Sequence, residues 1–103
     1  MKYKYSFFRH LKMNFTVRAV KRALKEKGMT QYRLAKDIGY DRSNVSKMLK
    51  GKRPIPLYKF PVICKALDVR PEYLLDAYTQ DIRRSMYKYF KDIEKKKIGE
   101  SDV

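Results

Sequence analysis

The chain has 103 residues, a formal net charge of +15 and one cysteine, Cys64. This length allows one small domain with one appended element. The single cysteine excludes an internal disulfide or a zinc site built from cysteines, and its expected place is the core. No apolar run approaches the roughly 20 residues of a membrane span. The N-terminus has a basic start but no long apolar region or small-residue cleavage site, so no secretory signal is expected.

The positive charge is unevenly distributed. Residues 1–53 carry 16 Lys and Arg against three acids, a net +13, whereas residues 54–103 carry ten against eight, a net +2. Solubility alone would not require this concentration of charge in one half of the chain. The distribution predicts a polyanionic partner for the first half.

Residues 1–15 form a basic and aromatic extension. Lys2 to Tyr5 alternate as in a strand, whereas Phe8, Leu11 and Phe15 have helical spacing. Three interpretations stay open: a loosely docked extension, an arm along DNA phosphates or in the minor groove, and a segment that stabilises a dimer. Met13 is a second possible start of the natural chain.

A first helix is expected from Thr16, as N-cap, to Lys27, with Gly28 as its stop. Its inner stripe is Val17, Val20, Ala23 and Leu24. The basic residues between them, Arg18, Lys21, Arg22 and Lys25, are expected on a solvated face, with phosphate contact as the second alternative.

Residues 30–51 predict two short helices around a tight turn. Thr30 is the expected cap of the first helix and Gly39 its left-handed end; Asp41 is the expected cap of the second helix and Gly51 its end. The apolar spacing gives the inner residues Leu34, Ala35, Ile38, Val45, Met48 and Leu49. The outer face of the second helix is polar and basic, which suits a DNA groove.

Two further helices complete the expected core. After a loop stiffened by Pro54 and Pro56, a fourth helix begins near Tyr58 or Lys59. A fifth begins at Pro71. The expected inner residues are Phe60, Ile63, Cys64, Leu67, Tyr73, Leu74 and Leu75.

Residues 77–98 predict an additional amphipathic helix, followed by a tail over 99–103. Polar residues, Asp81 among them, separate its apolar positions. The apolar stripe must be buried on a partner copy, on its own domain or, as a third alternative, on a membrane surface. A dimer interface is the favoured interpretation, formed by Tyr78, Ile82, Met86, Tyr89, Phe90 and Ile93.

Together these motifs resemble the phage repressor and Cro family of helix-turn-helix proteins, also called the Xre family. The resemblance spans about residues 16–76 and rests on the series Thr30-Gln31, Leu34-Ala35, Gly39, Val45-Ser46, Gly51-Lys52-Arg53, Ala66-Leu67-Asp68-Val69 and Tyr73-Leu74. It implies an all-α fold, a five-helix lambda-repressor-like helix-turn-helix domain, here with the additional C-terminal helix.

The chemistry of the second helix suggests base-reading residues. Arginine can bind guanine O6 and N7, asparagine adenine N6 and N7, and serine and lysine adapt to several edges. The expected readers are Arg42, Ser43, Asn44, Ser46 and Lys47, which match positions used for base or adjacent phosphate contact in the family. The expected phosphate contacts are Gln31, Lys36, Lys50, Lys52 and Arg53.

The favoured function is a sequence-specific transcriptional regulator, a repressor that binds an inverted-repeat operator in double-stranded DNA as a homodimer. A partner-binding regulator such as an antitoxin, and a sequence-neutral architectural protein, remain as alternatives. An enzyme is not expected, since His10 is the only histidine and no Ser/His/Asp or Cys/His set exists. No cofactor, metal site or membrane partner is expected, and the expected location is the cytoplasm of a bacterium, with the gene bacterial or phage-encoded.

Overall fold

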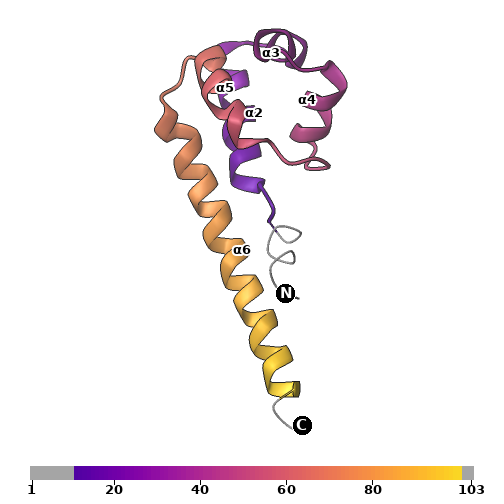
Figure 1. Cartoon of the computed structure of the whole chain (residues 1–103). Coiled ribbons are helices and arrows are strands. Elements are labelled where there is room, and N and C mark those ends of the chain that lie inside the picture. The colour runs from indigo at the N-terminus through magenta and orange to yellow at the C-terminus, as the bar shows by residue number, and fades with distance from the viewer. Residues whose placement is uncertain (1–10, 101–103) are drawn as a thin grey trace.

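A computed structural model describes residues 11–100, with side chains placed for residues 11–95. This part of the chain contains helices and no strand. The elements are α2 (Asn14–Lys27), α3 (Gln31–Ile38), α4 (Arg42–Leu49), the 3-10 turn η1 (Leu57–Lys59), α5 (Phe60–Leu67) and α6 (Pro71–Glu100). Helices α2 to α5 form a body, and α6 passes along it and continues well beyond it (Figure 1). The predicted all-α fold class is confirmed.

The core of the body consists of the residues that helical periodicity selected. Val20, Ala23 and Leu24 of α2 are buried, as are all the predicted inner residues of α3, α4 and α5. Leu74 of α6 is fully buried among them. Cys64 is buried in the same cluster, and desolvation raises the pKa of its thiol, which keeps the thiol protonated and unreactive.

The turn between α3 and α4 has the predicted chemistry. Thr30 accepts a hydrogen bond on its side-chain oxygen from the backbone N–H of Arg33, at 3.1 Å, and so caps α3. Gly39 ends α3 at φ 71°, a left-handed conformation that residues with a Cβ seldom adopt. Gly28 ends α2 in the same way, at φ 68°.

One predicted cap is right in position only, and another is wrong. Asp41 is the N-cap residue of α4 and has the extended backbone of that position, but its exposed carboxylate makes no capping hydrogen bond to α4. Thr16 is not at the helix end at all: α2 begins at Asn14, and Thr16 is a fully buried residue of its first turn. At the other end of α4, Lys50 is the C-cap and Gly51 follows it.

The first turn of α2 is capped from α6. The carboxylate of Asp81 accepts hydrogen bonds from the backbone N–H of Phe15 at 2.8 Å, from that of Thr16 at 2.9 Å and from the Thr16 hydroxyl at 2.6 Å. These are N–H groups that no carbonyl of the helix can satisfy, and a carboxylate also suits the positive end of the helix dipole. Asp81 is only 1% exposed, so its predicted place on the polar face is wrong.

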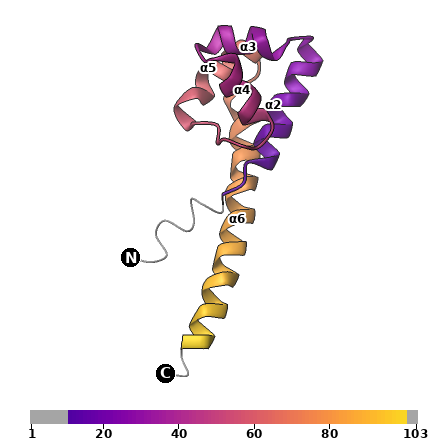
Figure 2. The ribbon, with the colours of Figure 1, turned by 90° about the vertical axis from the view of Figure 1, so that its right-hand side faces the viewer.

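Further polar contacts hold α6 against α2. The Tyr73 hydroxyl donates to the Ala19 carbonyl at 2.9 Å, and the Lys12 backbone N–H donates to the Ser85 hydroxyl at 3.3 Å. Together with Asp81 these contacts extend over several turns of α6, and Figure 2 shows α6 passing beside α2. The first half of α6 is therefore fixed to the body.

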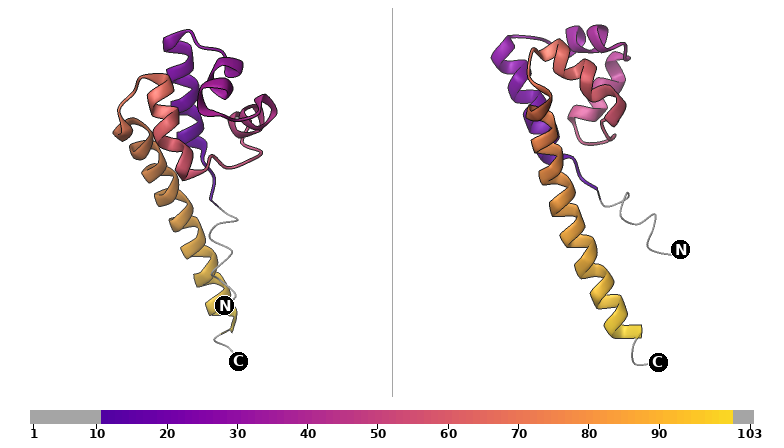
Figure 3. Two further views of the ribbon diagram at one scale, coloured as in Figure 1. Left: turned by 45° about the horizontal axis from the view of Figure 1, so that its top comes forward. Right: turned by 60° about the vertical axis from the view of Figure 1, so that its left-hand side comes forward.

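Helix α6 joins what the sequence suggested as two helices. The structure has no break near residues 76 and 77, and the helix includes Gly99 and Glu100 of the predicted tail; residues 101–103 lie outside the described residues. No glycine or proline interrupts residues 72–98, so the continuity had a sequence signal. At 1.5 Å per residue α6 is about 45 Å long, which accounts for a molecule measuring 57 × 24 × 19 Å (Figure 3).

Candidate nucleic-acid interface

Helix α4 packs against the rest of the body with its polar side outward. Val45, Met48 and Leu49 are buried beneath it. Of the predicted base-reading residues, Arg42, Ser43 and Lys47 are exposed, whereas Asn44 and Ser46 are half-buried. Ser43 and Lys47 lie opposite the buried side by helix geometry, and Arg42 and Asn44 lie at the two borders of the exposed face.

Arg42, at the start of α4, lies against an aromatic ring. Its guanidinium carbon is 5.7 Å from the ring centroid of Tyr32, the second residue of α3. Tyr32 is itself 59% exposed, so this cation–π contact is on the surface. Tyr32 had no signal in the sequence, because no local pattern links it to a residue ten positions later.

Asn44, at the opposite border of α4, is hydrogen-bonded to the loop that follows the helix. The Arg53 guanidinium donates to its side-chain oxygen Oδ1. Two residues with different predicted roles, base reading for Asn44 and phosphate contact for Arg53, are thereby brought together. The amide cannot be reversed in this contact, since arginine has only donors.

The predicted phosphate contacts are all exposed, and they come from α3 and from the segment after α4. Gln31 is the first residue of α3, Lys36 lies on the outer side of α3, and Lys50, Lys52 and Arg53 follow α4. A hollow of about 360 Å³ beside Lys50 is also lined by Arg18 and Lys21 of α2. For these two cations a solvated face was the favoured expectation and phosphate contact the alternative, and the structure places them beside Lys50 in the basic surface around α4.

A cluster of Tyr40, Tyr58 and Lys59 supports the turn between α3 and α4. The Lys59 ammonium donates to the Ile38 carbonyl at the end of α3, at 2.7 Å, and lies 4.5 Å from the Tyr40 ring centroid. The two tyrosine hydroxyls are 3.1 Å apart, and this hydrogen bond raises the pKa of Tyr40. The turn that positions the start of α4 is thus tied to η1 and α5.

The predicted interface residues of the C-terminal helix lie in two environments. Tyr78 is half-buried against the body, with its ring edge-on to Phe60 at a centroid distance of 5.4 Å. Met86 and Phe90 are each 58% exposed. Ile82, Tyr89 and Ile93 are half-buried.

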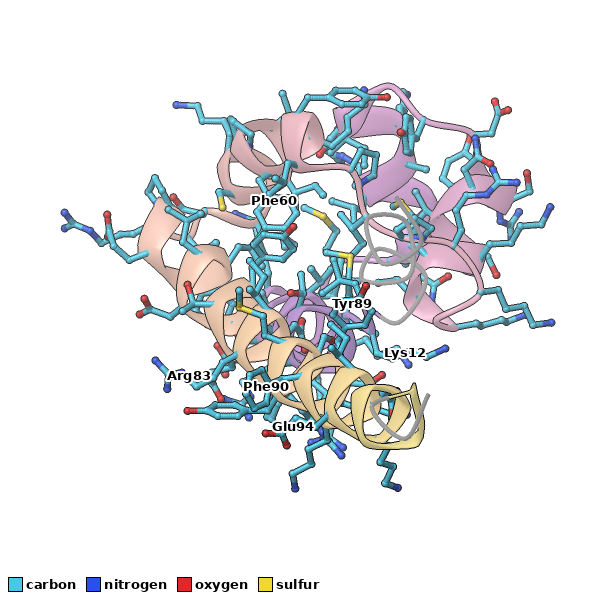
Figure 4. The ribbon with its side chains drawn as sticks, turned by 60° about the horizontal axis from the view of Figure 1, so that its bottom comes forward. Lys12, Phe60, Arg83, Tyr89, Phe90 and Glu94 are labelled. Atoms are coloured by element: carbon cyan, nitrogen blue, oxygen red, sulfur yellow. The ribbon has the colours of Figure 1, made fainter. Side chains whose placement is uncertain are left out.

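An open apolar hollow marks the side of α6 that faces away from the body. Its volume is about 480 Å³, and it is lined by Thr79, Ile82, Arg83, Met86, Tyr87 and Phe90. In Figure 4 Arg83, Phe90 and Glu94 lie on this side of α6, opposite Lys12 and Tyr89. Leu75, predicted as core, is 47% exposed; the continuous helix turns it away from the body.

Neither a membrane span nor a metal site emerges from the described residues. Over the ranges that the structure describes, no helix is long and apolar enough to cross a membrane. In the same part of the chain, no three His, Cys, Asp or Glu side chains come close enough to hold a metal ion.

Comparison with known proteins agrees with this geometry. The family model of the Cro/C1-type HTH DNA-binding domain matches residues 19–80. The crystal structure of the restriction-modification controller protein C.AhdI from Aeromonas hydrophila is similar at 29% identity and a TM-score of 0.56, over 60% of this chain and 94% of that one. The wild-type restriction-modification controller protein C.Esp1396I is similar at 25% identity and a TM-score of 0.58, over 70% and 94%.

No curated protein matches the chain. The family match nevertheless covers more than half of its residues, including every element from α3 to α5. It confirms the resemblance drawn from the motifs and the expectation of a regulator rather than an enzyme. The chain belongs to the Cro/C1-type helix-turn-helix family and is a DNA-binding transcription regulator.

Proposed function

We propose that the chain represses transcription by binding an inverted-repeat operator as a homodimer, with α4 of each copy in a major groove. The observation that carries the proposal is the exposed face of α4, where Arg42, Ser43 and Lys47 point away from a rigid apolar core. This face belongs to the half of the chain that holds +13 of the net charge of +15.

The contacts divide into two groups. Arg42, Ser43, Asn44, Ser46 and Lys47 contact base edges, since their side chains match the donor and acceptor pattern of the major groove. Gln31, Lys36, Lys50, Lys52 and Arg53 contact phosphates and fix the position of α4. Because phosphate contacts release counterions, binding weakens steeply as salt is raised.

A second copy is proposed because α4 has only eight residues and reads few base pairs. The face of α6 that would join two copies has apolar or small residues at helical spacings of three and four, through Leu75, Thr79, Ile82, Met86, Phe90 and Ile93. Phe90 and Met86 of this region are large, apolar and exposed. A second α6 packed on them would remove this apolar surface from water.

A footprint tests the operator. We expect two protected half-sites about 10 base pairs apart, centre to centre, with Arg42→Ala abolishing protection at concentrations where the wild type saturates. Arg70→Ala is the matched control, an exposed arginine at the start of α6 outside the proposed interface. Binding that shows no sequence preference would contradict the proposal, while protection of a single half-site would contradict only the dimer.

Light scattering tests the dimer. Met86→Lys combined with Phe90→Lys is expected to give a folded monomer, as judged by unchanged helical circular dichroism. Lys91→Glu, an exposed change on the same helix but away from the apolar stripe, is expected to leave the dimer intact. If the wild type is itself a monomer, the exposed face favours the second candidate, a regulator whose α6 binds a different protein, as an antitoxin does.

The two similar structures suggest a more specific form of the proposal. Both are restriction-modification controller proteins. In this form the chain would bind promoter DNA of restriction-modification genes. Binding to that DNA, compared with random DNA of equal length, separates this form from repression of unrelated genes.

A further inference from the structure

The exposed face of α4 has a centre and two borders, and the side chains at the centre and at the borders differ in their contacts with other residues. Ser43 and Lys47 lie at its centre, and the structure describes no side-chain hydrogen bond or ring contact for either of them. Arg42 and Asn44 lie at the borders, and each is held by a residue outside α4. The two holding residues come from different elements, Tyr32 from α3 and Arg53 from the loop after α4.

Tyr32 restricts where the Arg42 guanidinium can lie. An arginine at the first position of a helix is otherwise free to rotate about several bonds, and that freedom is lost when it binds a base. The ring of Tyr32, 5.7 Å from the guanidinium carbon, reduces this freedom before DNA arrives. A planar guanidinium held on a ring still offers its edge N–H groups to guanine O6 and N7.

Arg53 fixes which atoms Asn44 offers. An asparagine that recognises adenine must turn both its oxygen and its nitrogen toward the base, accepting from N6 and donating to N7. Here the oxygen is turned toward the Arg53 guanidinium. One of the two lone pairs of the Asn44 oxygen is then engaged and the oxygen is held toward Arg53, so this border offers mainly the Nδ2 donors of Asn44 and the remaining donors of Arg53.

We propose that Tyr32 and Arg53 are specificity-determining positioning residues, which act through Arg42 and Asn44. This inference rests on the proposed function of α4 as the base-reading helix. It changes one expectation from the sequence: the Asn44 border selects a base edge that presents acceptors, such as guanine N7 and O6, and does not pair with adenine. It also places part of the specificity outside the recognition helix.

The test is selection of bound sequences from a random double-stranded DNA pool, followed by competition with operators changed at single base pairs. The base pair that loses its preference in Arg42→Ala is the one read by Arg42. At that base pair Tyr32→Ala is expected to lower the preference about two- to fivefold, the size of an exposed cation–π contact. Tyr32→Phe keeps the ring and is expected to keep the preference.

Arg53→Met is expected to change the kind of preference. Once the oxygen of Asn44 is released, the base pair identified by Asn44→Ala should shift from guanine toward adenine. Lys52→Met is the matched control, since it removes one exposed charge from the same loop. It should weaken binding to every sequence equally and lower the salt dependence, as the loss of a phosphate contact does.

The outcomes separate the two proposals. If the wild type selects no motif, the proposed function is wrong and this inference falls with it. If the wild type selects a motif while Tyr32→Ala and Arg53→Met weaken all sequences equally, only this inference is overturned. Tyr32, Lys52 and Arg53 are exposed, so circular dichroism melting should show that Tyr32→Ala, Tyr32→Phe, Lys52→Met and Arg53→Met fold as the wild type does.

Discussion

The N-termini of α3 and α2 are satisfied in opposite ways. Helix α3 is capped by its own neighbour, since Thr30 accepts from an N–H only three residues later. Helix α2 is capped from Asp81, which is 65 residues away in the chain. The first cap stabilises a helix, whereas the second also fixes one helix to another. The N-terminus of a helix in this fold is therefore capped either by a neighbouring residue or by a residue of a different helix, and the second kind of cap also holds the two helices together.

Removal of the tertiary cap should have the largest effect on stability. Asp81→Ala leaves two buried donors of Thr16 and the N–H of Phe15 without a partner. We expect a loss of about 3–4 kcal/mol in the free energy of unfolding, from the desolvation cost of unpaired buried donors. Urea denaturation measures it. A loss of stability no larger than that of Thr30→Ala would show that Asp81 does not hold α6 against α2.

Thr16→Val should cost less, about 1–2 kcal/mol, because it removes one hydroxyl donor while the two backbone N–H bonds to Asp81 remain. A double-mutant cycle with Asp81→Ala isolates their interaction. We expect the two losses to be smaller together than their sum. Additive losses would mean that the two side chains do not stabilise the fold through their mutual contact.

Thr30→Ala should cost about 1 kcal/mol, the usual value for loss of an exposed N-cap side chain. The same denaturation experiment measures it, and Thr30→Ser, which keeps the oxygen, serves as its control. The contact of α2 with α6 should be unaffected. A loss comparable to that of Asp81→Ala would remove the difference between the two kinds of cap.

Asp41→Ala should have the smallest effect, below about 0.5 kcal/mol. The carboxylate makes no capping bond, so only its favourable interaction with the dipole of α4 is lost. Raising the salt concentration should reduce even this difference. A loss of 1 kcal/mol or more, unchanged by salt, would indicate a cap that forms in solution.

This contrast explains which features could be predicted. The helix-turn-helix was predictable because its signals are local: Thr30, Gly39 and the apolar spacing of α3 and α4 all act within a few residues. The burial of Asp81 was not, since a charged residue between apolar positions has the same pattern whether it faces water or another helix. The start of α2 was misplaced for the same reason, because its cap comes from a different part of the sequence.

In the candidate site, too, the locally determined features could be predicted and the tertiary contacts could not. Exposure of Arg42, Ser43 and Lys47 follows from helical periodicity and could be predicted. The contacts of Arg42 with Tyr32 and of Asn44 with Arg53 depend on how α3 and the later loop pack against α4. Periodicity contains no information about such packing. The base-reading chemistry of Arg42 and Asn44 could therefore be predicted, but the residues that contact them could not.

The unbroken course of α6 has a consequence for how such chains can change in length. Between Asp81, which is fixed to α2, and the exposed Met86 and Phe90, every residue adds about 100° of rotation about the helix axis. An insertion of one residue would therefore turn the apolar stripe to a different azimuth relative to α4. Insertions of about seven, eleven or eighteen residues restore its phase to within roughly 20°, so such lengths would keep both recognition helices of a dimer directed toward the same side of the DNA.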